Sequence, residues 1–151
     1  SVEAIAKLKH AGYQVYIATN QSGIHRGYYS VDTLHAMHDK LATLLKEYDV
    51  AIDGIEFCPH GPDDNCDCRK PKAGMYLNIA KKAGLSDCSG MLVVGDSLRD
   101  LQAAQAVNAT PYLVKTGKGE RTIKKGEGLE GIHVYNDLSD FVKQLLNGAV
   151  T

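Results

Sequence analysis

Residues 91–107 have the sequence MLVVGDSLRDLQAAQAV, which joins a strand to a helix within one short segment. Met91–Val94 is a compact apolar run, typical of a buried strand. The strand ends in Gly95-Asp96, and a helix is predicted over Leu98–Val107. A strand followed directly by a helix is the building block of parallel sheets.

The same alternation continues on both sides of this unit and predicts a Rossmann-like, doubly wound parallel α/β sheet with helices on both faces. Residues 59–71 and the Gly- and Lys-rich residues 117–131 are predicted as loops, the second one mobile. The other predicted elements are a helix over Val2–Leu8 closed by Gly12, a strand at Tyr13–Thr19, a helix following Ser30, a strand at Gly54–Cys58, a helix at Ala73–Ala83, a strand at Tyr112–Val114 and a helix at Asp137–Leu146.

The composition predicts one ordinary globular domain over residues 1–151, with 44% hydrophobic residues. This excludes intrinsic disorder and collagen-like folds. Seventeen basic against eighteen acidic residues give a formal net charge of −1, which argues against a general nucleic-acid binder, including a zinc ribbon. No apolar run predicts a membrane span, and the start does not resemble a secretory signal. We therefore expect a cytoplasmic protein, and a monomer because no heptad pattern is sustained.

Three cysteines and one histidine form the pattern Cys58-x-His60-x5-Cys66-x-Cys68. Three thiolates and one imidazole complete the tetrahedral shell of a structural zinc site. Four protein ligands leave no position for water, so we expect a zinc ion that makes the loop rigid. The alternatives are reduced cysteines without a metal, or an iron–sulfur site that recruits Cys88.

Two polar clusters are candidates for binding a phosphate. Thr19-Asn20-Gln21-Ser22-Gly23 follows a predicted strand, where hydroxyl, amide and turn N–H groups can cradle phosphate oxygens. The alternative is an ordinary polar turn. Arg69-Lys70 follows the last predicted zinc ligand and offers two cations to a phosphate, the alternative being a solvated basic pair.

Asp96 and Asp100 follow the strand at residues 91–94 and are four residues apart. One carboxylate at a strand end and another on the first helical turn can hold Mg²⁺, directly and through water. The alternative is that both only cap the helix. Because ligands bind at the carboxyl ends of parallel strands, we expect all these clusters at one sheet edge. Phosphate donors, cations and a magnesium carboxylate together favour phosphoryl transfer, for which a nucleophile is still missing.

Three segments resemble motifs of the haloacid dehalogenase superfamily: ATNQSG at 18–23, CPHGPDDNCDCRKPKAGM at 58–75 and VGDSLRDLQAA at 94–104. The resemblance is to its zinc-containing branch of histidinol-phosphatases and D-glycero-D-manno-heptose-1,7-bisphosphate 7-phosphatases. Residues 72–75 and 114–117 are more similar to the heptose enzymes. The resemblance implies that Thr19 and Asn20 bind the transferring phosphoryl group and that Lys70 stabilises it. It also implies that Arg69 helps to select the substrate and that Asp96 ligates magnesium.

The resemblance further implies a D-x-D motif that supplies an aspartyl nucleophile, on a central strand. No two Asp residues of this chain are separated by a single residue. We therefore expect about 25–30 further residues before Ser1, from the usual lengths of βα units, and no turnover through an aspartyl-phosphate by residues 1–151 alone.

The resulting hypothesis is a magnesium-dependent phosphatase that acts on a phosphorylated sugar and contributes to ADP-heptose supply for surface polysaccharide. The first alternative is hydrolysis of histidinol phosphate. The second is a catalytically inactive, zinc-stabilised module that binds a phosphorylated ligand.

Overall fold

The computed structural model describes residues 2–20, 31–58, 66, 70 and 72–150. The chain divides into two compact units, Ser1–Arg69 and Lys70–Thr151, and each unit has its own parallel sheet. Strands and helices alternate along the chain, so the predicted parallel α/β class is confirmed. In the described ranges, no helix is long and apolar enough to cross a lipid bilayer.

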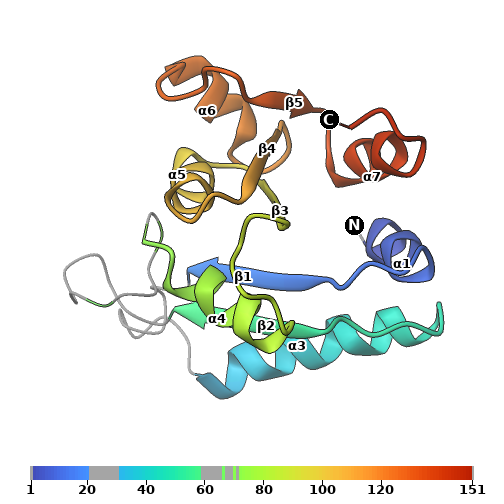
Figure 1. The fold of residues 1–151 in the computed structure, drawn as a ribbon. Coiled ribbons are helices and arrows are strands. Elements are labelled where there is room, and N and C mark those ends of the chain that lie inside the picture. The colour runs from blue at the N-terminus through green and yellow to red at the C-terminus, as the bar shows by residue number, and fades with distance from the viewer. Residues whose placement is uncertain (1, 21–30, 59–65, 67–69, 71, 151) are drawn as a thin grey trace. The chain divides into compact units, whose positions relative to one another are not determined.

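The N-terminal unit contains a two-stranded parallel sheet (Figure 1). Its strands pair from Tyr16 beside Gly54 to Asn20 beside Cys58. The Tyr16 ring lies 3.0 Å from the position that a Cβ of Gly54 would occupy, so the ring covers this glycine. The elements are α1 (Val2–His10), β1 (Tyr16–Asn20), α3 (Val31–Lys46) and β2 (Gly54–Cys58).

The first strand begins three residues later than predicted, because the preceding backbone makes other hydrogen bonds. Gly12 has a φ of +93°, and the N–H of Tyr13 donates to the carbonyl of Leu8 over 3.1 Å. This left-handed turn confirms Gly12 as the predicted helix terminator. The N–H of Tyr13 is thus taken by the helix end and that of Val15 by the side chain of Asp53, and β1 starts at Tyr16.

The partly exposed carboxylate of Asp53 connects helix α1 to the start of strand β2. Asp53 Oδ2 accepts from Lys9 Nζ over 2.7 Å and from the N–H of Val15 over 2.6 Å. Burial by itself raises the pKa of Asp53, but the hydrogen bonds from Lys9 and Val15 outweigh it, and the pKa is lowered. The ionised form is therefore favoured in the folded state.

The C-terminal unit contains a three-stranded parallel sheet in the order β3-β4-β5 (Figure 1). Helix α5 packs against β3 and β4, and helix α7 packs against β5. The elements are α4 (Gly74–Lys82), β3 (Leu92–Gly95), α5 (Leu98–Ala106), β4 (Thr110–Val114), α6 (Gly119–Lys125), β5 (His133–Tyr135) and α7 (Leu138–Leu146).

Three aromatic rings, one each from β4, β5 and α7, pack together in the C-terminal unit. The ring of Tyr112 lies 4.9 Å from that of Phe141 and 6.1 Å from that of Tyr135. Tyr135 and Phe141 meet edge to face at 5.3 Å and 82°. Edge-to-face arrangements are favourable for aromatic pairs. These contacts hold helix α7 against strands β4 and β5.

The predicted helices over 73–83, 98–107 and 137–146 are confirmed as α4, α5 and α7. Strand β4 begins two residues before its predicted start, since the ladder accepts Pro111 without losing a bond. The N–H of Thr110 donates to Met91 of the neighbouring segment over 2.9 Å, and the pairing with β5 begins only at Tyr112. The nitrogen of Pro111 therefore faces a position where no partner strand needs a donor.

The prediction of a mobile loop over residues 117–131 is wrong. Seven of these residues form helix α6, and strand β5 follows at residues 133–135. The helix buries Gly119 and Thr122 and ends at Gly126, whose φ is +70°. A helix of two turns shows too few apolar positions for its period to be recognised in the sequence.

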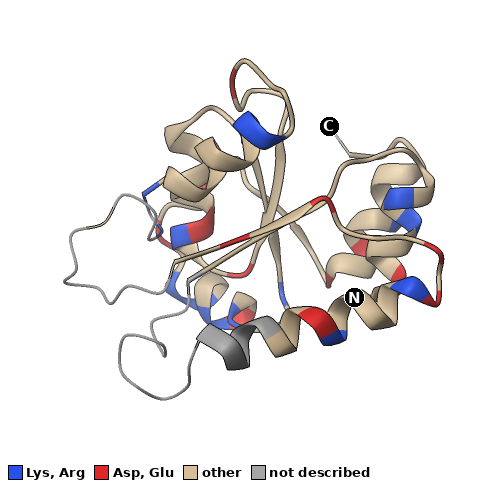
Figure 2. Ribbon diagram, turned by 90° about the horizontal axis from the view of Figure 1, so that it is seen from below, with Lys and Arg blue, Asp and Glu red and all other residues tan. Residues whose placement is uncertain are grey.

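Basic and acidic side chains share the same helices (Figure 2). Helix α1 carries an exposed Glu3–Lys7 pair at 3.8 Å, and helix α6 carries Glu120 together with Lys124. Exposed pairs of this kind contribute little to stability. The mixture agrees with the near-zero net charge of the chain.

Candidate active site

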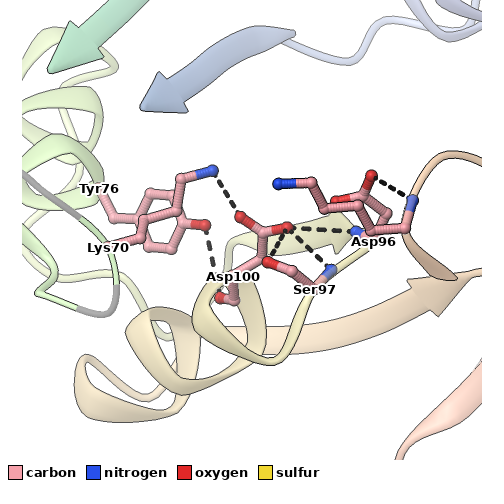
Figure 3. A network of polar contacts seen from close by, with 6 residues as sticks. Lys70, Tyr76, Asp96, Ser97 and Asp100 are labelled. Carbon is pink, nitrogen blue, oxygen red and sulfur yellow. Dashed lines mark hydrogen bonds and ion pairs between the residues drawn. The ribbon is translucent and has the colours of Figure 1, made fainter. Parts of the chain in front are cut away.

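The first turn of helix α5 is organised around the carboxylate of Asp100. Its Oδ2 accepts from the N–H of Asp96 over 3.1 Å, from the N–H of Ser97 over 3.2 Å and from the Ser97 hydroxyl over 3.1 Å (Figure 3). These donors belong to the start of the helix, where backbone N–H groups lack partners within the helix. Asp100 is 7% exposed, and its position as the third helical residue is that of a capping-box acid.

The other oxygen of Asp100 binds Lys70. Lys70 Nζ lies 2.5 Å from Oδ1, and both side chains are 11% exposed (Figure 3). The two carboxylate oxygens therefore have separate roles, because Oδ2 fixes the helix start and Oδ1 fixes the ammonium group. A charge-assisted hydrogen bond at this burial is among the stronger polar contacts in a protein.

Tyr76 of helix α4 approaches the same turn from the buried side. Its hydroxyl donates to the carbonyl of Asp100 over 3.4 Å. Burial raises the pKa of Tyr76, and the negative charge of Asp100 raises it further. Tyr76 is therefore a neutral donor, and it places α4 against the residue that holds Lys70.

Strand β3 can pass this close to Asp100 only because it ends in glycine. A Cβ at Gly95 would lie 2.6 Å from Asp100 Oδ2 and 2.7 Å from Cγ. Contacts this short are repulsive, so any side chain at Gly95 would displace the carboxylate. Glycine here is required by space, since its φ lies outside the left-handed region.

Asp96 extends from the end of β3 toward the turn that follows β4. Its Oδ2 accepts from the N–H of Lys118 over 3.0 Å, and its carbonyl accepts from the Thr122 hydroxyl over 2.8 Å. The carboxylate is half-buried, at the carboxyl end of a parallel strand. A hard oxygen donor in this position suits Mg²⁺, which binds proteins through one or two carboxylates and otherwise keeps water or phosphate.

The N-terminal unit holds the other predicted groups that the structure describes. Thr19 and Asn20 end β1, where they pair with Phe57 and Cys58 at the end of β2. Cys58 is fully buried, and its sulfur lies 3.5 Å from that of Cys66. A disulfide bond is about 2.05 Å long, so the two sulfurs are not bonded. Two thiolates on one tetrahedral zinc ion, each with a Zn–S bond of about 2.3 Å, lie about 3.8 Å apart. The observed separation is close to that value, so Cys58 and Cys66 fit a zinc site.

The structure thus brings the predicted residues together in two groups. One contains Lys70, Asp96 and Asp100, and the other contains the strand ends with Cys58 and Cys66. Among the described residues, no group of three or more His, Cys, Asp or Glu side chains gathers in metal-binding geometry. The predicted site residues that lie outside the described residues are Gln21, Ser22, His60, Cys68 and Arg69.

Sequence reasoning missed the residues that support Lys70 and Asp96. Tyr76, Lys118 and Thr122 contact the site from 20 or more residues away in the chain. Of these, only Lys118 carried a signal, since it lies in the Gly- and Lys-rich segment that follows the predicted strand at Tyr112–Val114. Tyr76 and Thr122 sit in helices and resemble ordinary buried positions.

Comparison with known proteins gives the family of this chain. Residues 67–141 match the HAD-hydrolase-like family. The chain belongs to this family, the haloacid dehalogenase-like hydrolases, and it has their Rossmann-like fold.

Several of its relatives share one name. It is 52% identical over 146 residues to the D-glycero-beta-D-manno-heptose-1,7-bisphosphate 7-phosphatase of Pseudomonas aeruginosa, covering 97% of this chain and 81% of the relative. The solved structure of the D,D-heptose 1,7-bisphosphate phosphatase from Bordetella bronchiseptica, complexed with magnesium and phosphate, is 48% identical with a TM-score of 0.93. The match covers 99% of this chain and 83% of the chain in that structure. The corresponding phosphatase from Burkholderia thailandensis is 41% identical with a TM-score of 0.75, over 96% of this chain and 83% of that one.

Proposed function

We propose that this chain belongs to a magnesium-dependent phosphatase that removes the 7-phosphate of D-glycero-D-manno-heptose 1,7-bisphosphate. The observation that carries the proposal is the network in which Asp100 holds Lys70 on one oxygen and the start of α5, next to Asp96, on the other. A fixed cation beside a carboxylate at a strand end is the arrangement that phosphoryl transfer requires. The substrate follows from the names of the relatives that are about 50% identical.

The residues of this chain bind and orient the phosphoryl group in this proposal. Lys70 neutralises charge on the phosphoryl oxygens, and Asp100 holds its ammonium group at 2.5 Å. Because that position is fixed before substrate arrives, no reorganisation is needed in the transition state. Thr19, Asn20, Gln21 and Ser22 supply hydroxyl, amide and N–H donors to the same oxygens, and Arg69 contributes to substrate selection.

Asp96 is the residue that would hold magnesium. When bound, the ion neutralises the phosphoryl oxygens and orients the group for attack. Asp100 would reach the ion through water, since its Oδ1 accepts one hydrogen bond from Lys70 and a carboxylate oxygen can accept more than one. The magnesium and phosphate bound by the Bordetella bronchiseptica relative support this part of the proposal.

Zinc is the second metal of the proposal and has a structural role. Cys58, His60, Cys66 and Cys68 would complete its shell, and the 3.5 Å separation of the first and third of these residues supports the site. A metal bound by four protein ligands has no position for water, so no reaction step depends on it.

The nucleophile stays a prediction. The resemblance places it in a D-x-D motif before Ser1, where it would form an aspartyl-phosphate that water then hydrolyses. Reading the gene upstream of Ser1 tests this, and a stop codon there in place of the motif would contradict it. We also propose a single domain over residues 1–151, a cytoplasmic location, a monomeric state and a role in ADP-heptose supply.

The direct test compares phosphate release by the full-length protein from heptose 1,7-bisphosphate and from histidinol phosphate, with and without Mg²⁺. We expect a higher kcat/KM on the heptose, and activity that depends on Mg²⁺. Faster turnover of histidinol phosphate would overturn the substrate assignment. Binding of the heptose without phosphate release would favour the catalytically inactive module instead.

A further inference from the structure

The turn between β4 and α6 encloses the side chain of Asp96. The N–H of Lys118 donates to Asp96 Oδ2 over 3.0 Å. The preceding residue, Gly117, has a φ of +61°, and a Cβ at this position would overlap the same Oδ2 atom. The backbone of the turn therefore lies against the carboxylate so closely that only glycine fits.

Helix α6 holds the backbone of Asp96 through Thr122. The Thr122 hydroxyl lies 2.8 Å from the Asp96 carbonyl and 3.1 Å from the carbonyl of Lys118, one turn earlier in its own helix. A hydroxyl has a single proton to donate. The shorter contact is the one to Asp96, and it connects helix α6 to the residue that follows β3. Because Thr122 is only 9% exposed, this bond is shielded from water.

These contacts leave the two oxygens of the Asp96 side chain in different states. Oδ2 accepts from the turn, whereas in the part of the chain that the structure describes no donor contacts Oδ1. Rotation about the side chain would break the bond to Lys118. One oxygen is therefore fixed and the other remains available to a ligand.

We infer that Gly117, Lys118 and Thr122 are positioning residues that hold Asp96 as a one-oxygen ligand and thereby set the affinity for Mg²⁺. The inference rests on the proposed function only in taking Asp96 as the magnesium carboxylate. Mg²⁺ demands near-ideal octahedral geometry, so it is sensitive to the orientation of each ligand. Loss of an outer hydrogen bond to a metal ligand typically costs about 10–100-fold in metal affinity.

The first test replaces Thr122 in the full-length protein and measures metal binding without substrate. Mn²⁺ binding is followed by electron paramagnetic resonance, with Mg²⁺ as competitor. Thr122→Val removes the hydroxyl at nearly constant shape and is expected to weaken binding about 10-fold. Thr122→Ser keeps the hydroxyl and should bind as the wild type does. Thr110→Val, at the opposite end of β4, controls for the chemistry of the substitution.

A second pair of variants tests the same inference in case a substitution at the buried Thr122 prevents folding. Gly117→Ala and Gly126→Ala both place a side chain at positive φ, +61° and +70°. Only the first overlaps Asp96, because the nearest atom to a Cβ at Gly126 is 3.8 Å away. Equal backbone strain with unequal metal binding would therefore identify the contact with Asp96 as the cause.

The outcomes separate this inference from the proposed function. Weaker metal binding in Thr122→Val and Gly117→Ala, with wild-type binding in their partners, supports it. In activity assays the Mg²⁺ concentration for half-activation should then rise about 10-fold while kcat at saturating Mg²⁺ changes little. Wild-type metal affinity in both variants would overturn the inference, as would a wild-type protein that binds neither ion. A protein that binds metal with these differences but releases no phosphate would contradict the proposed function alone.

Discussion

Replacing Asp100 by Asn tests the arrangement on which the site depends. An Asn side chain has nearly the same shape, and its amide oxygen can still accept from the N–H groups of Asp96 and Ser97. What it loses is the negative charge opposite Lys70 Nζ, 2.5 Å away in a site where both side chains are 11% exposed. The substitution therefore isolates the ion pair from the helix cap.

The size of the effect follows from the burial of the pair. Removing one partner of a buried ion pair costs about 3–5 kcal/mol, because the remaining charge keeps its desolvation penalty. Because the side chains of Lys70 and Asp100 keep 11% exposure and are not completely buried, the expected loss lies near the lower end of this range, at about 3 kcal/mol. Asp100→Ala also removes the cap and should cost about 1 kcal/mol more.

The measurement is a double-mutant cycle by urea unfolding of the full-length protein. With an m-value of about 2 kcal/mol per molar urea, Asp100→Asn should lower the midpoint by about 1.5 M. Lys70→Met combined with Asp100→Asn should cost less than the sum of the single changes, with a coupling of about 2–3 kcal/mol. A coupling below about 0.5 kcal/mol would show that the two charges are not paired, and the account of the site would fail.

Three further predictions concern other contacts. Gly95→Ala should displace the carboxylate of Asp100 and cost about 1–3 kcal/mol in urea unfolding, and a stable, fully active variant would contradict the steric reading. Asp53→Asn should cost about 1 kcal/mol at pH 7, since the charged hydrogen bond from Lys9 is partly exposed. Because the folded pKa of Asp53 is lowered, its contribution is present above its unfolded pKa of about 3.9 and is lost as the pH falls through the folded value. The difference from the wild type should therefore close as the pH falls from about 5 to below 3.9, and a constant difference would refute it. Cys66→Ser should release about one zinc equivalent by elemental analysis and lower the Tm, whereas an unchanged zinc content would exclude the site.

The sequence was sufficient for the elements with a clear period or a clear terminator. Helices α4, α5 and α7 were predicted over residues 73–83, 98–107 and 137–146, close to their observed bounds. The parallel α/β class followed from the alternation of such elements. In each case the information is local, since it lies within about a dozen residues of the element.

Short elements stabilised by distant partners were beyond this reasoning. Helix α6 has seven residues and strand β5 has three, which is too few to display a period. They form because residues distant in the sequence supply partners, such as the carbonyl of Asp96 for Thr122. Long-range packing therefore decided the structure of a segment whose Gly and Lys content favours a loop.

The candidate site shows the same division. Asp96 and Asp100 were recognised from their position at a strand end, and the helix cap was recognised as an alternative role of Asp100. The sequence could not show that one carboxylate binds both the helix start and Lys70, because these residues are 30 positions apart. Whether Asp100 also reaches a metal through water stays a prediction.

The cluster of Tyr112, Tyr135 and Phe141 gives the C-terminal unit an optical signature of its own. The chain has eight tyrosines and no tryptophan, so its near-ultraviolet circular dichroism comes mainly from tyrosine rings. Rings fixed by tight packing contribute to that signal, and they lose it when packing is lost even if helices persist. Two of the eight tyrosines are held at fixed angles under helix α7. The docking of that helix can therefore be followed spectroscopically in the unmodified protein.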